Sequence, residues 1–173
     1  MKLQKSLDAF LFCCYAGMRY SDFTNLSKKN IVDINQETWL IYKSVKTGTE
    51  VRLPLYLLFA GKGIVILNKY RSNLEDFFRL RDNSNINKDL IIIAKLEGLS
   101  KKISFHTARH TNATLLIYNG VNITTVQKLL GHKSVKTTQV YTNIMDMTIV
   151  HDLEKIKQAA LGIKKKTDNS FNK

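Results

Sequence analysis

The sequence predicts a mainly α-helical domain that carries one small β-sheet. Apolar side chains recur at helical spacing at the start of the chain and again from residue 107 onward, whereas short β-rich runs separated by turn residues occur in 31–53. Of the 173 residues, 44% are hydrophobic and 24% are charged, which is typical of a soluble globular domain. A chain of this length buries roughly 70% of its unfolded surface, enough for one sizeable core.

The first predicted helix covers residues 2–16, whose apolar side chains lie close to helical spacing. Gly17 is expected to end it, because glycine is common just past a helix C-terminus. Ser21 can then cap a short helix that runs to about residue 26.

Three β-rich runs predict the sheet: residues 31–34, 39–42 and 51–53. Residues 46–49, Lys-Thr-Gly-Thr, form the expected turn between the last two runs. Pro54 is expected to close the sheet, since proline cannot donate a ladder hydrogen bond.

The middle of the chain is less clearly patterned. Residues 56–80 are helical in pattern but interrupted around 61–63, and the polar stretch 81–87 is expected to be a loop. Residues 89–97 contain the run Leu-Ile-Ile-Ile, which local propensity alone cannot assign to helix or strand.

Capping signals predict the helices that follow. Thr107 can cap a helix that runs to about residue 118. Thr124 and Gln127 have the spacing of a capping box for the next helix, and Gly131 is expected to end it.

Ser134 can cap a further helix that carries Tyr141. Residues 151–160 are amphipathic and lead into three consecutive lysines and a polar tail. Because the chain shows no internal repeat and no low-complexity linker, we expect one domain over residues 1–150. A C-terminal helix and basic tail would occupy 151–173.

The net charge of +13 points to a polyanionic partner. The charge is spread along the chain, which favours a basic face on a folded body, and nucleic acid is the commonest partner of such a face. A basic protein that binds nothing is the alternative on charge alone.

The chain shows no run of about 18 apolar residues and no secretory signal, so no membrane partner is expected. Cys13 and Cys14 are adjacent, which is a poor geometry for a mutual disulfide. We therefore expect a reduced protein in the cytoplasm, associated with the nucleoid if the source is bacterial.

His106 and Arg109 lie three residues apart at a predicted helix start. A helix N-terminus presents unpaired N–H groups and the positive end of its dipole, and an arginine can bind two oxygens of one phosphate. Taken singly, such residues are more often surface or structural groups. The same holds for Arg19, Lys46, His132 and Tyr141.

In combination, these residues have the order of a known family's motif. The stretches that carry it are Gly17-Met18-Arg19-Tyr20-Ser21-Asp22, Lys46-Thr47-Gly48, His106-x-x-Arg109, Leu130-Gly131-His132 and Tyr141. The ordered set closely resembles the tyrosine recombinase (phage-type integrase) family, as do the flanking stretches 107–114 and 136–142. The resemblance covers residues 2–145. It implies the family's catalytic-domain fold, mainly α with a small three-stranded antiparallel β-sheet (α+β), in which 89–97 is helix.

The resemblance implies a site-specific DNA recombinase or integrase that cleaves and rejoins strands through a covalent 3′-phosphotyrosyl intermediate, for integration or excision of a mobile element. Tyr141 is the expected nucleophile. Because a phenol with a pKa of about 10 is protonated at neutral pH, His106 is the candidate general base or proton relay. By resemblance, Lys46 is the general acid that protonates the departing 5′-hydroxyl.

Arg19 and Arg109 are expected to bind the non-bridging oxygens of the scissile phosphate, and His132 to hydrogen-bond the same phosphate. Asp22 is expected to orient a basic neighbour. These side chains already supply positive charge, so no metal is expected, and the cysteines and histidines lack zinc-ligand spacing. No cofactor is expected, since residues 61–63 do not form a phosphate loop.

The expected partner is double-stranded DNA, bound by a homotetramer whose subunits are monomeric when free. Family members usually carry an N-terminal DNA-binding domain, which we expect to be absent from this chain. Residues 151–173 are expected either to be exchanged between protomers or to fold back on their own domain. No small-molecule substrate is expected.

Three other function classes stay open at this point. One is a catalytically inactive remnant of the family, which the complete set of motif residues argues against. A type IB topoisomerase uses a similar residue set and would relax a supercoiled plasmid that lacks any specific site. A non-catalytic basic DNA-binding protein would need only the charge and the helices. Replacing Tyr141 by Phe would leave such a binder unaffected, whereas an enzyme would lose covalent attachment to DNA.

Overall fold

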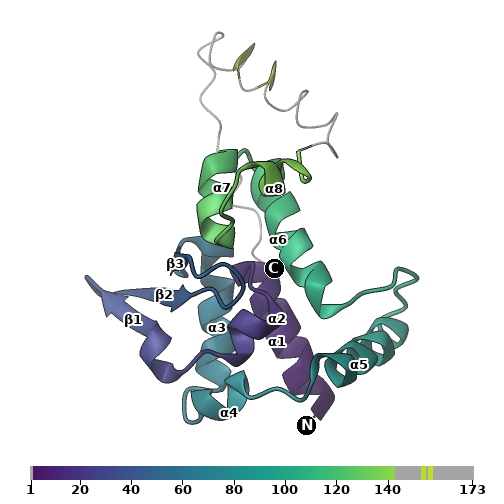
Figure 1. Ribbon diagram of the computed structural model, residues 1–173. Helices are drawn as coiled ribbons and strands as arrows, with labels where there is room; N and C mark the ends of the chain where they lie inside the picture. The colour runs from purple at the N-terminus through teal and green to yellow at the C-terminus, as the bar shows by residue number, and fades with distance from the viewer. Residues whose placement is uncertain (1, 143–152, 155, 158–173) are drawn as a thin grey trace, which may run out of the picture.

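The computed structural model describes residues 2–142, 153–154 and 156–157. The protein is mainly helical with one three-stranded antiparallel sheet, as predicted (Figure 1). Most of the expected C-terminal helix and tail lies outside the described residues. Within the described part of the chain, no helix has both the length and the apolar character needed to cross a membrane.

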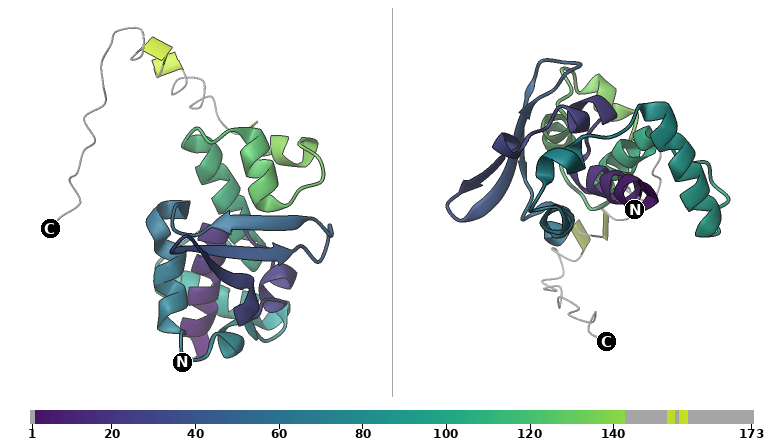
Figure 2. Two further views of the ribbon diagram at one scale, coloured as in Figure 1. Left: turned by 90° about the vertical axis from the view of Figure 1, so that its left-hand side faces the viewer. Right: turned by 90° about the horizontal axis from the view of Figure 1, so that it is seen from below.

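The elements follow one another along the chain in this order: α1 (Lys2–Ala16), α2 (Tyr20–Thr24), the 3₁₀ turn η1 (Lys28–Asn30), β1 (Ile31–Ile34), β2 (Glu37–Lys43), β3 (Glu50–Pro54), the 3₁₀ turn η2 (Leu58–Gly61), α3 (Lys62–Lys69), α4 (Leu74–Phe78), α5 (Asn83–Leu96), α6 (Phe105–Tyr118), α7 (Ile123–Leu130) and α8 (Lys136–Gln139). Helix α1 is central, because α3, α5 and α6 all pack against it. The sheet stands on one side of this helical body (Figure 2).

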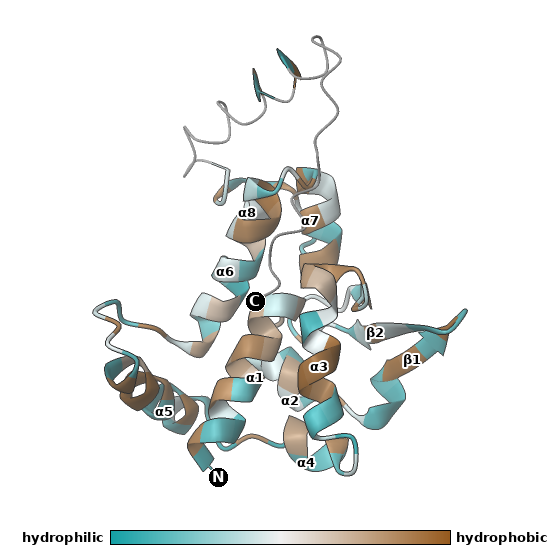
Figure 3. Ribbon diagram, turned by 180° about the vertical axis from the view of Figure 1, so that it is seen from behind, coloured by the Kyte–Doolittle hydropathy of each residue, from teal (hydrophilic) through white to brown (hydrophobic). Residues whose placement is uncertain are grey.

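An aromatic cluster holds the centre together. Phe12 of α1 meets Phe23 of α2 and Phe77 of α4 edge to face, with ring centroids 5.9 and 6.2 Å apart. Phe105, at the start of α6, joins through Phe23. All four rings are buried, so the cluster ties α1, α2, α4 and α6 to one core. Apolar residues gather along α1 and α3 in the view from behind (Figure 3).

The sheet has the strand order β1-β2-β3 with antiparallel pairing throughout. Leu40 of β2 pairs with Leu53 of β3, and both are fully buried. Along β3, buried Val51 and Leu53 alternate with exposed Glu50 and Arg52. The predicted strands, the turn after β2 and the end of the sheet at Pro54 are confirmed. This pairing sets the position of the β2–β3 turn, where Ser44 N–H donates to Thr49 O at 2.9 Å.

Two predictions for the middle of the chain need correction. The polar stretch 81–87 is not a loop, because α5 begins at Asn83 and Asp82 caps it by accepting from the Asn85 N–H. Helix through 89–97 is confirmed up to Leu96. The helical pattern over 56–80 is divided into η2, α3 and α4. The interruption predicted around 61–63 is confirmed at Gly61, whose φ is +72°, whereas the second break, at 70–73, was not predicted.

Three predicted caps are also wrong by a few residues. Arg19, rather than Ser21, precedes the first residue of α2. Ser104 caps α6 in a reciprocal box with Thr107, and Asn122 caps α7 through the Thr124 N–H.

The helix predicted to carry Tyr141 is shorter than expected. Helix α8 ends at Gln139, so Tyr141 lies in the turn after it.

Gly17 ends α1 with φ +67°, in the left-handed region that favours glycine. A Cβ here would lie 2.6 Å from Asn112 Oδ1 and 2.8 Å from Leu130 Cδ2. The Asn112 amide caps the helix by donating to Cys14 O at 3.0 Å and Tyr15 O at 2.9 Å. Gly17 therefore allows α6 and α7 to approach the end of α1 closely.

We predict that Gly17→Ala lowers the free energy of unfolding by roughly 2–5 kcal/mol. This total combines about 1–2 kcal/mol for alanine in a left-handed backbone conformation and about 1–3 kcal/mol for the overlap of its Cβ with Asn112 and Leu130. Gly98→Ala is the matched control, because Gly98 has the same φ of +67° but nothing within 4 Å of its added Cβ. Urea unfolding measures both. Equal losses in the two variants would contradict the close approach at Gly17.

Candidate active site

The six predicted residues come from separate segments of the chain. They are Arg19 before α2, Lys46 in the β2–β3 turn, His106 and Arg109 in α6, His132 after α7 and Tyr141 after α8. The structure brings them into one region. The charges of Arg19 and Arg109 act on the pKa values of His106, His132 and Tyr141, and the charge of Lys46 acts on that of His106.

An open pocket marks the accessible side of this region. It has a volume of about 410 Å³ and is lined by Arg19, Lys46 and His106. Tyr20, Ser21 and Asn83 complete its wall. Three of the six predicted residues therefore face one hollow.

Arg109 is the buried member of the group, with 1% of its surface exposed. Its Nη1 donates to Gly17 O at 2.7 Å and its Nη2 donates to Leu130 O at 2.5 Å. These carbonyls lie at the C-terminal ends of α1 and α7, where the helix dipole favours a cation. Burial, followed by the charge of Arg19, lowers the pKa of Arg109 to about 10, so it stays protonated at neutral pH.

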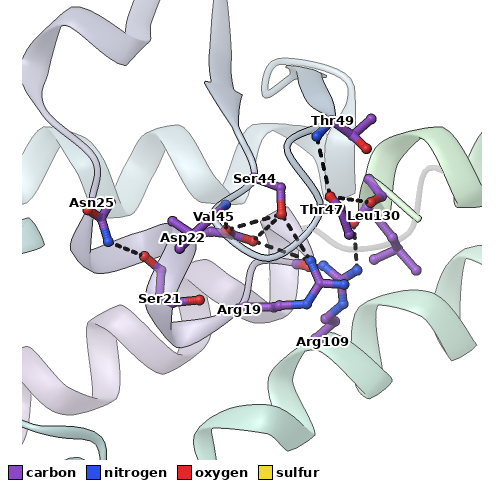
Figure 4. Close-up of polar contacts among 12 residues, drawn as sticks. Arg19, Ser21, Asp22, Asn25, Ser44, Val45, Thr47, Thr49, Arg109 and Leu130 are labelled. Carbon is purple, nitrogen blue, oxygen red and sulfur yellow. Dashed lines mark hydrogen bonds and ion pairs between the residues drawn. The ribbon is translucent and has the colours of Figure 1, made fainter. Parts of the chain in front are cut away.

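Arg19 is held by a buried carboxylate. Its Nη1 donates to Asp22 Oδ2 at 3.5 Å and to Ser44 Oγ at 3.2 Å (Figure 4). Asp22 also accepts from the Val45 N–H at 2.8 Å and from Ser44 Oγ. Asp22 thus makes the expected contact with a basic neighbour, and it also fixes the start of the β2–β3 turn beside Arg19.

The β2–β3 turn brings Lys46 to the rim of the pocket. Besides the bond from the Val45 N–H to Asp22, a second hydrogen bond holds this turn: Thr47 Oγ1 donates to Gly131 O at 3.1 Å (Thr47 is labelled in Figure 4). Lys46 itself is exposed. The turn is therefore tied to α2 through Asp22 and to the residue after α7 through Gly131. Lys46, between these two attachments in the sequence of the turn, stays exposed at the pocket.

His132 is buried, and its imidazole Nδ1 lies 2.9 Å from Thr138 Oγ1. Burial, with Arg109 and Arg19 as further causes, lowers the pKa of His132 to about 4. The ring is therefore neutral at neutral pH.

His106 is exposed at the first turn of α6. Partial desolvation lowers its pKa below the usual 6.5, and the nearby charges of His110, Arg109, Arg19 and Lys46 lower it further. His106 is thus a neutral imidazole at neutral pH and can accept a proton.

Tyr141 is buried, with 6% of its surface exposed. Its ring centroid lies 5.4 Å from that of His110, which in turn lies 4.5 Å from His106. Burial raises the pKa of Tyr141, and this outweighs the opposite effect of Arg109 and Arg19. The phenol is therefore protonated in the free protein and needs a base in order to act as a nucleophile.

Four residues around this group were not predicted: Ser44, His110, Asn112 and Thr138. His110 follows Arg109 and lies one helical turn after His106, so helical spacing could have indicated it. Thr138 lies within a stretch that matches the family's phrase. Ser44 had no local signal, because its partner Asp22 is distant in the sequence.

No cluster of three or more His, Cys, Asp or Glu side chains that could hold a metal ion occurs among residues 2–142, 153–154 and 156–157. The donor set around Arg109 is cationic and imidazole in type, which suits an anion rather than a metal.

Comparison with known proteins extends these observations. The chain is 30% identical over 159 residues to tyrosine recombinase XerC of Rickettsia prowazekii (strain Madrid E), covering 87% of this chain and 49% of that protein. It thus spans about half the length of this curated relative.

Two solved structures share the fold. XerA recombinase superposes with a TM-score of 0.67 at 23% identity, over 89% of this chain and 63% of that one. Lambda integrase bound to DNA gives 0.61 at 22% identity, over 75% and 49% of the two chains. At these identities the similarity concerns the fold alone.

The phage integrase family matches residues 4–147, a span that contains all six of the residues that converge here. This chain belongs to the phage integrase family, that of the tyrosine recombinases.

Proposed function

We propose that this chain is the catalytic part of a site-specific DNA recombinase, which cleaves and rejoins strands through a 3′-phosphotyrosyl intermediate. One observation carries the proposal: two guanidinium groups, two neutral imidazoles and a buried phenol interact electrostatically around one region, with a lysine at its open rim. Such a set matches the needs of phosphoryl transfer, which are an in-line nucleophile, charge neutralisation and a proton donor.

The scissile phosphate would bind between the two arginines. Arg19 lines the pocket, whereas Arg109 is buried and its orientation is fixed by Gly17 O and Leu130 O. Donors held in place before the reaction stabilise the charge that develops on the non-bridging oxygens. The neutral imidazole of His132 would add one N–H donor to the same phosphate.

Cleavage would then proceed with balanced proton transfers. The Tyr141 oxygen bonds to phosphorus as its proton passes to neutral His106, and the bond from phosphorus to the 5′-oxygen breaks. Lys46 gives a proton to that leaving oxygen. The reverse sequence, with a 5′-hydroxyl as nucleophile, rejoins a strand and releases Tyr141.

Duplex DNA is the proposed substrate. The net charge of +13 favours it, and lambda integrase, which shares this fold, has been solved bound to DNA. We further propose that residues 1–150 form the catalytic domain, that four copies assemble on DNA and that the protein serves a mobile element.

The first test concerns Tyr141. A pool of nicked suicide duplexes of randomised sequence, labelled at the 5′ end, is incubated with the protein, and adducts are resolved by denaturing electrophoresis. We expect the wild type to form a covalent adduct that peptide mapping places on Tyr141. Tyr141→Phe should form none while retaining DNA affinity within about threefold, because only the nucleophilic oxygen is lost. An adduct in that variant would contradict the assignment.

Arg19→Ala should slow adduct formation by about a hundredfold at saturating DNA, the scale for loss of one donor to the transition state. Arg52→Ala is the matched control, because Arg52 lies on β3 in an exposed pair with Glu50. It should react within twofold of the wild type in single-turnover assays on a selected duplex. A near-normal rate for Arg19→Ala would remove Arg19 from the site.

The pH dependence follows from His106, whose pKa lies below 6.5. Protonation removes the base, so adduct formation should be constant near neutral pH and fall as the pH drops through that lowered pKa. Measurement at limiting DNA reports the pKa of the free protein. His106→Ala should be slow and should lose this acid limb. A wild-type midpoint above 6.5 would contradict the role of His106.

A further inference from the structure

Thr138 is a buried hydroxyl whose partner is the imidazole of His132. The residue is fully buried in α8, and its Oγ1 lies 2.9 Å from His132 Nδ1. Within residues 2–142 this is the one hydrogen bond made by the Thr138 side chain. The backbone carbonyl of Thr138 accepts from the Tyr141 N–H at 3.1 Å, so the residue contacts both the imidazole and the segment of the nucleophile.

The backbone of His132 is held by one neighbour, Gln127. Its N–H donates to Gln127 O at 3.0 Å, and its carbonyl accepts from Gln127 Nε2 at 3.1 Å. Because the ring is neutral, it carries a single proton on Nδ1 or on Nε2. The position of that proton decides which nitrogen can donate to a phosphate, since a phosphate oxygen can only accept from a neutral imidazole.

The hydrogen-bonding needs of the Thr138 hydroxyl distinguish the two tautomers of His132. If Nδ1–H donated to Oγ1, the Thr138 O–H would have no acceptor among the described residues, and a buried donor without a partner is costly. If the Thr138 O–H donates to Nδ1, that donor is used and the ring proton resides on Nε2. The second arrangement leaves no donor of this pair unsatisfied inside the protein.

We propose that Thr138 is a positioning residue that sets the tautomer of His132: its O–H donates to Nδ1, which makes Nε2–H the donor to the scissile phosphate. The contact with phosphate rests on the proposed function, whereas the tautomer does not. The Thr138–His132 bond also ties α8, a helix of one turn, to the segment that follows α7, and the two helices are in contact.

The test combines a tautomer measurement with a rate. In histidine-labelled protein at pH 7, ¹⁵N NMR distinguishes protonated from unprotonated ring nitrogens, and comparison with His132→Asn assigns the His132 signals. We expect Nε2–H in the wild type and in Thr138→Ser, and a mixture of tautomers in Thr138→Val, which keeps the shape and lacks the hydroxyl. Nδ1–H in the wild type, or an unchanged spectrum in Thr138→Val, would overturn the proposal.

Adduct formation on a selected suicide duplex gives the functional readout. Thr138→Val should slow it about tenfold with unchanged DNA affinity, while Thr138→Ser and the exposed neighbour variant Thr137→Val should stay within twofold of the wild type. Equal rates for Thr138→Val and wild type would overturn the positioning role. If the wild type shows Nε2–H but forms no adduct, the proposed function fails and the tautomer assignment stands.

Discussion

The buried guanidinium of Arg109 is the contact on which the rest of this site depends. A buried charge is costly unless every donor finds a partner, and here the partners are backbone carbonyls at the ends of two helices. Satisfying them requires α1 and α7 to end at a fixed place beside α6. Helix α1 ends there because Gly17 adopts a left-handed conformation and the Asn112 side-chain amide donates to the last carbonyls of the helix. The packing of these three helices in the core therefore fixes where the Arg109 guanidinium lies and how it is oriented.

The second constraint is an excess of positive charge around that cation. Among the described residues, Asp22 is the carboxylate that bonds to one of the six predicted residues, Arg19. Its oxygens also accept from Ser44 Oγ and from the Val45 N–H. Burial lowers the pKa values of Arg109 and His132, and repulsion by neighbouring arginines lowers them further, which favours neutral imidazole. A bound phosphate would relieve that repulsion, which links the charge of the free protein to the anion we propose as its substrate.

Local signals predicted much of the fold and failed where a tertiary contact chooses between neighbours. The extent of α1 and the stop at Gly131 agree with periodicity and with glycine preference, both of which are local. The cap of α6 was misplaced because Ser104 and Thr107 share one reciprocal box, so either reads as a cap. The start of α5 reads as a polar loop, yet Asn87 within it accepts from the Phe105 N–H, a contact with a distant segment.

For the site, the sequence by itself determined which residue types are present and in what order, and their similarity to a family motif singled out the six residues that we propose for the reaction. It did not determine burial, protonation or partners. Ser44 meets Asp22 only because the sheet brings the β2–β3 turn over α2, and the imidazoles of His106 and His132 lose their charge only where folding removes water and brings arginines near. Those properties depend on distances between segments far apart in the chain. Only the tertiary structure decides such distances, because desolvation and Coulomb interactions act through space rather than along the backbone.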